Sequence, residues 1–193
     1  MQFQPVDSAN EAYAAQILAE AFHDDPVINW SLNRPASLLP FFEFTLPVLV
    51  PHGLTYIDPD GNGAACWLGP KQKLKWPMGP SQAWKILSFG GMRGLYRMLL
   101  SGLKTERYHP KTPHYYLFAI GVVPHGKGQG LGTKLITELL RRCDEEGVPA
   151  YLENSKEENL PFYEGHGFKV QRQIRFAASA PPLWLMWREP QQS

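Results

Sequence analysis

The chain has 193 residues, of which 44% are hydrophobic, and its 19 basic and 18 acidic side chains leave a formal net charge of +1. This length suits one domain with a substantial core, and the balanced charge argues against the basic surface that nucleic-acid-binding proteins usually carry. Cys66 and Cys143 are too few for a disulfide framework and lack metal-ligand spacing, so we expect no metal site and a reducing, cytoplasmic location.

Residues 1–10 carry neither the basic segment nor the apolar stretch of a secretory leader. No apolar run approaches the ~18 residues that a membrane span requires. We therefore expect a soluble protein that contacts neither membrane nor nucleic acid.

The N-terminal third combines helical and strand-like patterns. Asp7 or Ser8 is the expected N-cap of the first helix, and Pro47 interrupts the second. The sequence PDGNG, Pro59 to Gly63, is typical of a hairpin turn. In chain order, the patterns predict a helix at 9–22, a loop at 23–30, a helix at 38–50, and strands at 55–58 and 64–68.

The segment 71–110 is rich in proline, glycine, tryptophan and basic residues. Its spacing predicts a helix at 82–103, which Gly90 and Gly91 are expected to break. We interpret 71–110 as a helical insertion within a single domain that spans residues 1–193.

The C-terminal half contains the clearest pattern of alternating elements. A strand, a crossover helix and a second strand of this length form a βαβ unit, which favours a mixed α/β sheet. In chain order, we predict a strand at 115–123, a glycine-rich loop, a helix at 130–146, a strand at 150–154, a short helix at 159–165, and strands at 169–176 and 183–188.

Four alternating glycines at 126–132 lie between the predicted strand and helix. A Walker phosphate loop is excluded because Gly128 follows Lys127 where a hydroxyl residue is needed, and a dinucleotide loop because Leu131 and Thr133 occupy required glycine positions. What remains is a run of backbone N–H groups at a helix N-terminus, which favours an anion such as a pyrophosphate. A flexible turn is the alternative.

The stretch from Val122 to Gly132 resembles the acyl-CoA-binding loop of the GCN5-related N-acetyltransferase (GNAT) family, whose pattern is V-x-P-x-x-[QR]-G-x-G-x-[GA]. Lys127 stands where Gln or Arg is usual, which keeps a positive charge but loses the planar fork. The segment from Tyr151 to Phe168 is similar to the family's second signature, a strand followed by N-x-x-FY-x-x-x-GF. The likeness is closest to the puromycin N-acetyltransferase branch, and the predicted insertion lies outside it.

The resemblance implies an α/β (α+β) fold with a mixed central sheet of about six or seven strands, flanked by helices and splayed between the two strands around the CoA site. It also implies acetyl-CoA as the cofactor. One residue expected to bind the cofactor, Asn159, could instead serve as the N-cap of the predicted short helix. The residues expected to bind the cofactor are Ile120, Val122, Val123, Lys127, Gly128, Gln129, Gly130, Gly132, Thr133 and Asn159.

Acetyl transfer to an amine needs a base for the amine, a donor for the oxyanion and a proton for the departing thiolate. By family equivalence Tyr163 supplies that proton, and its ordinary pKa near 10 permits the role; aromatic packing beside Phe162 is the alternative. Glu153 is the candidate base, acting directly or through water, with a solvated or ion-paired strand residue as the alternative. His114 is a lesser candidate.

In the family, the acceptor enters between the first two helices and the loop joining the last two strands. This implies Asp24, Asp25 and Trp30 as substrate-binding residues, because two carboxylates near an aromatic ring suit a cationic amine. Solvated charges that end a helix are the alternative reading of the pair.

The function implied is direct transfer of an acetyl group from acetyl-CoA to a primary amine of a small, antibiotic-like molecule. A protein or peptide acetyltransferase and a catalytically silent CoA-binding module are the alternatives. The sequence leaves open whether the protein is a homodimer.

Overall fold

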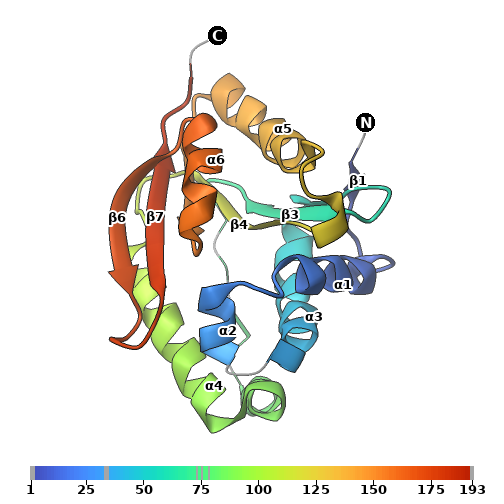
Figure 1. Cartoon of the computed structure of the whole chain (residues 1–193), viewed down its shortest axis with the longest axis vertical. Helices are drawn as coiled ribbons and strands as arrows, with labels where there is room; N and C mark the ends of the chain where they lie inside the picture. Colours follow the sequence, from blue (N-terminus) through green and yellow to red (C-terminus); the bar gives the residue numbers. More distant parts are fainter. Residues whose placement is uncertain (1–2, 33–34, 73, 75, 78, 192–193) are drawn as a thin grey trace.

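The computed structural model describes residues 3–32, 35–72, 74, 76–77 and 79–191. At its centre is a mixed sheet with strand order β1-β2-β3-β4-β5-β7-β6, which confirms the expected architecture of six or seven strands flanked by helices (Figure 1). The strands are β1 Gln4–Pro5, β2 Thr55–Ile57, β3 Gly63–Leu68, β4 Tyr115–Val122, β5 Ala150–Asn154, β6 Lys169–Arg175 and β7 Pro182–Arg188.

Strands β4 and β5 pair in parallel and all the other neighbouring pairs are antiparallel, so the predicted βαβ unit and the hairpin of β2 and β3 are confirmed. The α-helices are α1 Glu11–Ala21, α2 Pro26–Leu32, α3 Leu38–Leu49, α4 Pro80–Tyr108, α5 Leu131–Glu146 and α6 Leu160–Gly165. Short 3-10 helices are η1 Pro35–Ser37, η2 Val50–His52, η3 Pro124–Gly126 and η4 Glu157–Asn159.

Two apolar cores lie on the two faces of the sheet. Helices α1 to α4 pack on one face, where the core includes Tyr116 of β4 and Tyr151 of β5. Helices α5 and α6 pack on the other face, where Leu117 and Leu152 of the same strands are buried (Figure 1). Because side chains alternate along a strand, neighbouring residues of β4 and β5 contribute to opposite cores.

Helix α5 forms because its apolar residues recur on one side at helical spacing. Gly147, with φ of +64°, ends the helix in the left-handed conformation that glycine adopts most readily. Ion pairs between Arg141 and Glu145 and between Arg142 and Glu146 lie on the exposed side. The buried residues are Leu131, Leu135, Ile136, Leu139, Leu140 and Cys143.

The first helix differs from its prediction at the N-terminus. It begins at Glu11, and Asn10 occupies the N-cap position, so the expectation that Asp7 or Ser8 caps it is wrong. The Asp7 carboxylate instead accepts the N–H of Ala9 at 2.8 Å, in the turn that precedes the helix.

The segment predicted as a loop at 23–30 contains most of α2. Asp25 caps this helix by accepting the N–H of Ile28 at 2.7 Å, and Pro26 occupies its first position. Both are ordinary helix-start signals, but the helix is too short to show a periodic apolar pattern. Strand β1, with two residues, was also missed.

Helix α4 is longer than predicted and bends where the sequence indicated. Gly91 has φ of +64° and ψ of −176°, which separates two helical parts. A residue with a Cβ would be strained at this φ, so the break depends on glycine. Among the described residues, no helix combines the length and apolar character that crossing a bilayer requires.

Candidate active site

Strands β4 and β5 pair only over Tyr115–Leu117 and Ala150–Leu152, although β4 continues to Val122. Beyond Leu117 the sheet opens between them. This is the splay that the sequence resemblance implied, and it leaves one side of the second half of β4 without a partner strand.

A β-bulge lies at the start of this opening. On β3, Cys66 pairs with Ala119 and the next residue, Trp67, pairs with Leu117, so Phe118 is an extra residue in β4. A bulge bends its strand and reverses the direction of the backbone groups that follow. The opening therefore has a local cause in the register of β3 and β4.

The backbone of β4 beyond the bulge presents free groups to the opening. The N–H of Val123 donates to the carbonyl of Asn62 at 2.9 Å. In an antiparallel pair alternate residues face the partner strand, so Gly121 also faces β3, whereas Ile120 and Val122 direct their N–H and C=O groups into the opening. The backbone groups of these two residues are thus not used by β3, and their binding of a cofactor stays a prediction.

Val123 was expected to bind the cofactor through its backbone, but its N–H and C=O groups already have partners. Its N–H is bound to Asn62, and its carbonyl accepts the N–H of Gly126 at 2.9 Å. Both backbone groups are therefore used within the chain, and Val123 offers neither to a cofactor.

The glycine loop leads from η3 into α5 and exposes a series of N–H groups. Gly128 and Gly130 have φ of +79° and +73°, and Gly130 is the N-cap of α5. A Cβ built on either glycine meets nothing within 4 Å, so the space in front of the loop is open. Among the described residues, no backbone acceptor pairs with the N–H groups of residues 128–130, and the first turn of α5 adds those of residues 131–133.

Open space and unpaired N–H donors at a helix N-terminus fit a phosphate-bearing ligand. The N–H of Lys127 is an exception, because it donates to the carbonyl of Pro124 at 3.3 Å. Only the side chain of Lys127, which is exposed, is left to meet an anion.

The other residues predicted to bind the cofactor lie in the loop, in the first turn of α5 and at the start of α6. The Gln129 side chain donates to the carbonyl of His125 at 3.4 Å. Gly132 faces Phe162 of α6, and Thr133 is exposed. Asn159 occupies the N-cap position of α6 but makes no capping hydrogen bond, so its side chain is not committed to that alternative role.

Glu153 lies beside the opening on the face covered by α1 to α4. Its Oε2 accepts the Tyr116 hydroxyl at 2.6 Å and its Oε1 accepts the Tyr151 hydroxyl at 3.0 Å. The side chain of Glu153 is 12% exposed, and Nδ1 of His109 lies 3.8 Å from Oε1. Glu153 is thus a largely buried carboxylate held by two phenols, not a solvated strand residue.

The two phenols are fixed donors. Burial, and then the negative charge of Glu153, raise the pKa of Tyr116 and of Tyr151 well above the ordinary value. Both hydroxyls therefore stay protonated at neutral pH and keep Glu153 in one orientation.

Tyr163 lies on α6, on the opposite face of the sheet from Glu153. Its ring packs against Phe162 and Phe168, and the residue is 8% exposed. Burial, and then the negative charge of Asp25, raise its pKa. Tyr163 is therefore protonated at neutral pH, as a proton donor must be.

The side chains of Asp24 and Asp25, just before α2, contact the segment that follows β5. Asp24 pairs with Lys156 at 2.6 Å. Partial burial opposes ionisation of Asp24, but the hydrogen bond and the positive charge of Lys156 outweigh it and lower the pKa of Asp24. Asp25 is 2% exposed and accepts the Ser155 hydroxyl as well as the first turn of α2. Burial raises the pKa of Asp25. An acceptor amine would have to compete with these partners for either carboxylate.

Trp30 lies on α2 with its ring against Phe176, at 6.4 Å between centroids. The Arg97 guanidinium already occupies a position 4.5 Å from the ring centroid, and it donates to the Trp30 carbonyl at 2.6 Å. The cation that this tryptophan contacts in the structure therefore belongs to the chain itself.

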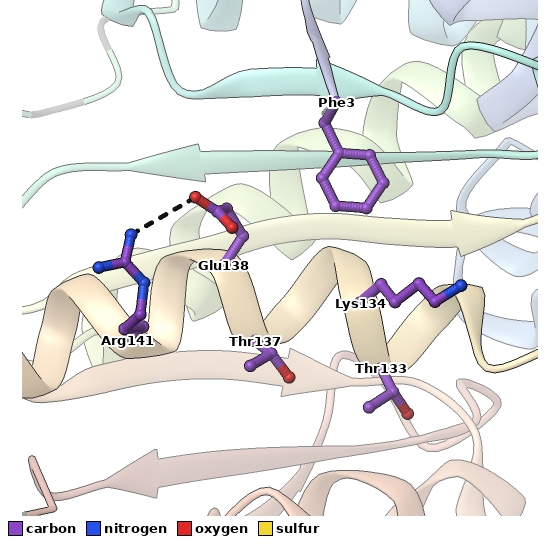
Figure 2. A pocket seen from close by; sticks show the side chains of 6 residues that line it. All are labelled: Phe3, Thr133, Lys134, Thr137, Glu138 and Arg141. Atoms are coloured by element: carbon purple, nitrogen blue, oxygen red, sulfur yellow. Dashed lines mark ion pairs between the residues drawn. The ribbon is translucent and has the colours of Figure 1, made fainter. Parts of the chain in front are cut away.

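A surface hollow of about 480 Å³ lies along the exposed side of α5 (Figure 2). It includes Thr133 but none of the predicted catalytic residues, and an ion pair between Glu138 and Arg141 closes one end. The transfer reaction is therefore not expected there. The lining residues are Phe3, Thr133, Lys134, Thr137, Glu138 and Arg141.

Comparison with known proteins agrees with this geometry. Residues 89–168, which include the opening, the glycine loop and Tyr163, match the Acetyltransferase (GNAT) family. The match covers less than half of the chain, and it shows a similarity to this family. The match begins inside α4, within the segment that we interpret as an insertion.

One relative aligns with nearly the whole chain. The chain is 28% identical over 208 residues to an uncharacterized N-acetyltransferase of Schizosaccharomyces pombe, covering 99% of this chain and 84% of the relative. None of the relatives described here is a puromycin acetyltransferase, so the assignment to that branch is not confirmed.

Two solved structures share the fold. Histone acetyltransferase HPA2 and related acetyltransferase from Corynebacterium glutamicum superimposes with a TM-score of 0.72 at 23% identity, over 100% of this chain and 97% of that one. The polyamine N-acetyltransferase of Drosophila melanogaster gives a TM-score of 0.65 at 15% identity, over 97% and 99%.

Proposed function

We propose that this protein is a GNAT acetyltransferase that transfers the acetyl group of acetyl-CoA directly to a primary amine of a small molecule. The observation that carries the proposal is the opening between β4 and β5. It has Glu153 at its start, the free backbone groups of Ile120 and Val122 along one edge, and the glycine loop at its far end.

The donor site is proposed on the α5–α6 side. The N–H groups of residues 128–133 would bind the diphosphate, with the Lys127 charge beside them. The pantetheine arm would follow Ile120 and Val122, and the side chain of Asn159 is free to contact it. When bound, acetyl-CoA supplies the activated acetyl group, and Tyr163 would supply the proton that the thiolate needs.

The acceptor is proposed to approach from the α1–α4 side. Glu153 lies on that face and Tyr163 on the other, so the base and the acid act from opposite sides of the gap between the strands. Asp24, Asp25 and Trp30 are proposed to line the approach, where a bound amine would exchange with Lys156 or Arg97.

Direct transfer is favoured over a route through an acetylated cysteine. Cys66 and Cys143 are both buried, and burial raises the pKa of each thiol to about 12. A thiol with so high a pKa provides almost no thiolate at neutral pH, and the thiolate is the nucleophile.

The acceptor class is the least constrained part of the proposal. The buried position of Glu153, between two tyrosines and His109, supports a compact amine over an extended peptide. The similarity to a histone acetyltransferase-related protein keeps peptide acetylation as a second candidate, and a silent CoA-binding module as a third.

The test is thiol release from acetyl-CoA with a panel of polyamines, arylalkylamines, aminoglycosides and histone-tail peptides. We expect saturable turnover with at least one small amine. Turnover with peptides alone would favour the second candidate, and tight CoA binding without any turnover the third. A lack of CoA binding in calorimetry would refute all three.

A further inference from the structure

This inference rests on the proposed function. At neutral pH a primary amine is an ammonium ion, so its acetylation yields an amide, a free thiol and one proton. Tyr163 gives a proton to the thiolate and must later regain one. Each turnover therefore leaves one net proton, which starts on the amine and has to leave a largely buried carboxylate.

Two neighbouring histidines, His109 and His114, lie beside Glu153. His109 follows the last residue of α4, and its Nδ1 is 3.8 Å from Oε1 of Glu153. Its Nε2 is 3.2 Å from Nε2 of His114, whose Nδ1 is 2.7 Å from the carbonyl of Thr112. The four groups form a row that begins at a backbone carbonyl and ends at the carboxylate.

The carbonyl fixes the tautomers along this row. Because a carbonyl oxygen only accepts, Nδ1 of His114 must carry a hydrogen, and in the neutral ring its Nε2 is then an acceptor. The hydrogen between the two rings must therefore lie on Nε2 of His109. Neutral His109 is left with a lone pair on Nδ1, directed at Glu153.

We propose that His109 takes the amine's proton from Glu153, and that His114 and the Thr112 carbonyl position His109 in the tautomer that can accept it. The N–H bond of the ammonium breaks as an O–H bond forms on Glu153. That O–H bond then breaks as an N–H bond forms at Nδ1 of His109, giving an imidazolium that releases the same proton to water.

The distance and exposure of His109 are consistent with this role. At 3.8 Å, Nδ1 is beyond hydrogen-bond range of Glu153, so the transfer uses a bridging water or a movement of the ring. The His109 side chain is 28% exposed, which gives the proton an exit. It also lies at the C-terminal end of α4, where the helix dipole favours a positive charge.

His114 is the positioning member of the pair and not the proton carrier. It is 7% exposed, and burial, and then a charge on His109, lower its pKa. The titratable groups that face His109 are Glu153 and Tyr151 from β5, Tyr116 from β4, and His114, which directly precedes β4.

The kinetic test compares the pH dependence of kcat for the wild type and for His109→Gln, with the half-buried His52 changed to Gln as the matched control. Protonated His109 cannot accept a proton, so wild-type kcat should fall at acidic pH. In His109→Gln, kcat at pH 7.5 should fall roughly 10- to 100-fold and this acidic limb should disappear. Imidazole should partly restore the rate of His109→Ala.

A second measurement needs neither substrate nor turnover. Nitrogen-15 spectra of the histidine rings in the wild type at pH 8 should show the hydrogen on Nε2 of His109 and on Nδ1 of His114. In His114→Phe, the Nε2 tautomer of His109 should no longer be enforced. The opposite tautomers in the wild type would overturn the relay, whether or not any variant folds.

The two proposals fail in different ways. An active wild type whose kcat and acidic limb persist in His109→Gln overturns the relay and leaves the proposed function intact. A wild type that releases no thiol with any amine or peptide overturns the proposed function, and the relay with it.

Discussion

Tyr116 donates a 2.6 Å hydrogen bond to Glu153 at the point where β4 and β5 separate. Tyr116 and Tyr151 face each other in the middle of the three parallel pairings of the two strands, and both hydroxyls donate to the same carboxylate. The two tyrosines, which also belong to the apolar core, therefore hold the Glu153 carboxylate in a fixed orientation at the edge of the opening.

Replacing Glu153 with Gln tests whether this carboxylate is the base. The amide keeps the shape of the side chain but cannot accept the amine's proton, so we expect kcat to fall by roughly 10²- to 10³-fold. The KM for acetyl-CoA should change little, since the proposed donor site is on the other face. Tyr116→Phe, which removes only one hydrogen bond to Glu153, should cause a smaller loss. If kcat of Glu153→Gln stays within twofold of the wild type, Glu153 is not the base.

Replacing Tyr163 with Phe tests the proton donor. The ring keeps its packing against Phe162 and Phe168, so thermal stability should be close to wild type. Without the hydroxyl, kcat should decrease roughly 10- to 100-fold while CoA binding, measured by calorimetry, is retained. Because the pKa of Tyr163 is raised, its deprotonation should not reduce wild-type activity below about pH 10. An unchanged kcat would indicate that water protonates the thiolate.

Much of the fold could be predicted from local patterns. Helix α5 and strands β4 and β5 are long or strongly apolar, and Gly91 lies where the sequence indicated a break. Helix α2 and strand β1 were missed because they are too short for a periodic pattern. Helix α2 depends on a buried cap, Asp25, whose carboxylate accepts a hydrogen bond from Ser155, 130 residues further along the chain.

The candidate site was predictable only where a motif is contiguous. The glycine loop and Tyr163 follow from such motifs, whereas the role of Val123 depends on its pairing with Asn62 of a distant turn. No local signal identifies His109: it reaches Glu153 only because α4 ends against the start of β4. Tertiary proximity of this kind is absent from a single sequence.

Replacing Gly130 with Ala tests the glycine loop. At φ of +73° a Cβ is strained, so the variant should lose about 1–2 kcal/mol of stability and should distort the N-terminus of α5. We expect the Kd for CoA to rise by roughly tenfold or more. Gly102→Ala is the matched control, since that glycine lies in α4 with nothing within 4 Å of an added Cβ. It should leave CoA binding unchanged and stabilise the helix slightly. Equal CoA affinity in both variants would contradict the proposed diphosphate site.

A buried ion pair connects α5 to the last strand. Asp144 accepts two hydrogen bonds from the Arg188 guanidinium, at 2.7 and 2.8 Å, and the N–H of Gln191 at 2.7 Å. Arg188 is 3% exposed, so removing its partner leaves a buried charge unpaired. We expect Asp144→Asn to lose about 2 kcal/mol at pH 7, less than for a fully buried pair because the Asp144 side chain is 21% exposed.

The same pair predicts how stability depends on pH. The hydrogen bonds from Arg188 lower the pKa of Asp144 below its unfolded value of about 3.9, so its contribution is complete above that value and is lost as pH falls through the folded pKa. The gap in unfolding free energy between wild type and Asp144→Asn, measured in urea, should therefore narrow below pH 4. Glu145→Gln, on the exposed side of the same helix, should have the same unfolding free energy as the wild type at pH 7 and at pH 3. A gap that stays constant from pH 7 to pH 3 would mean that the charge of Asp144 does not stabilise the junction of α5 and β7.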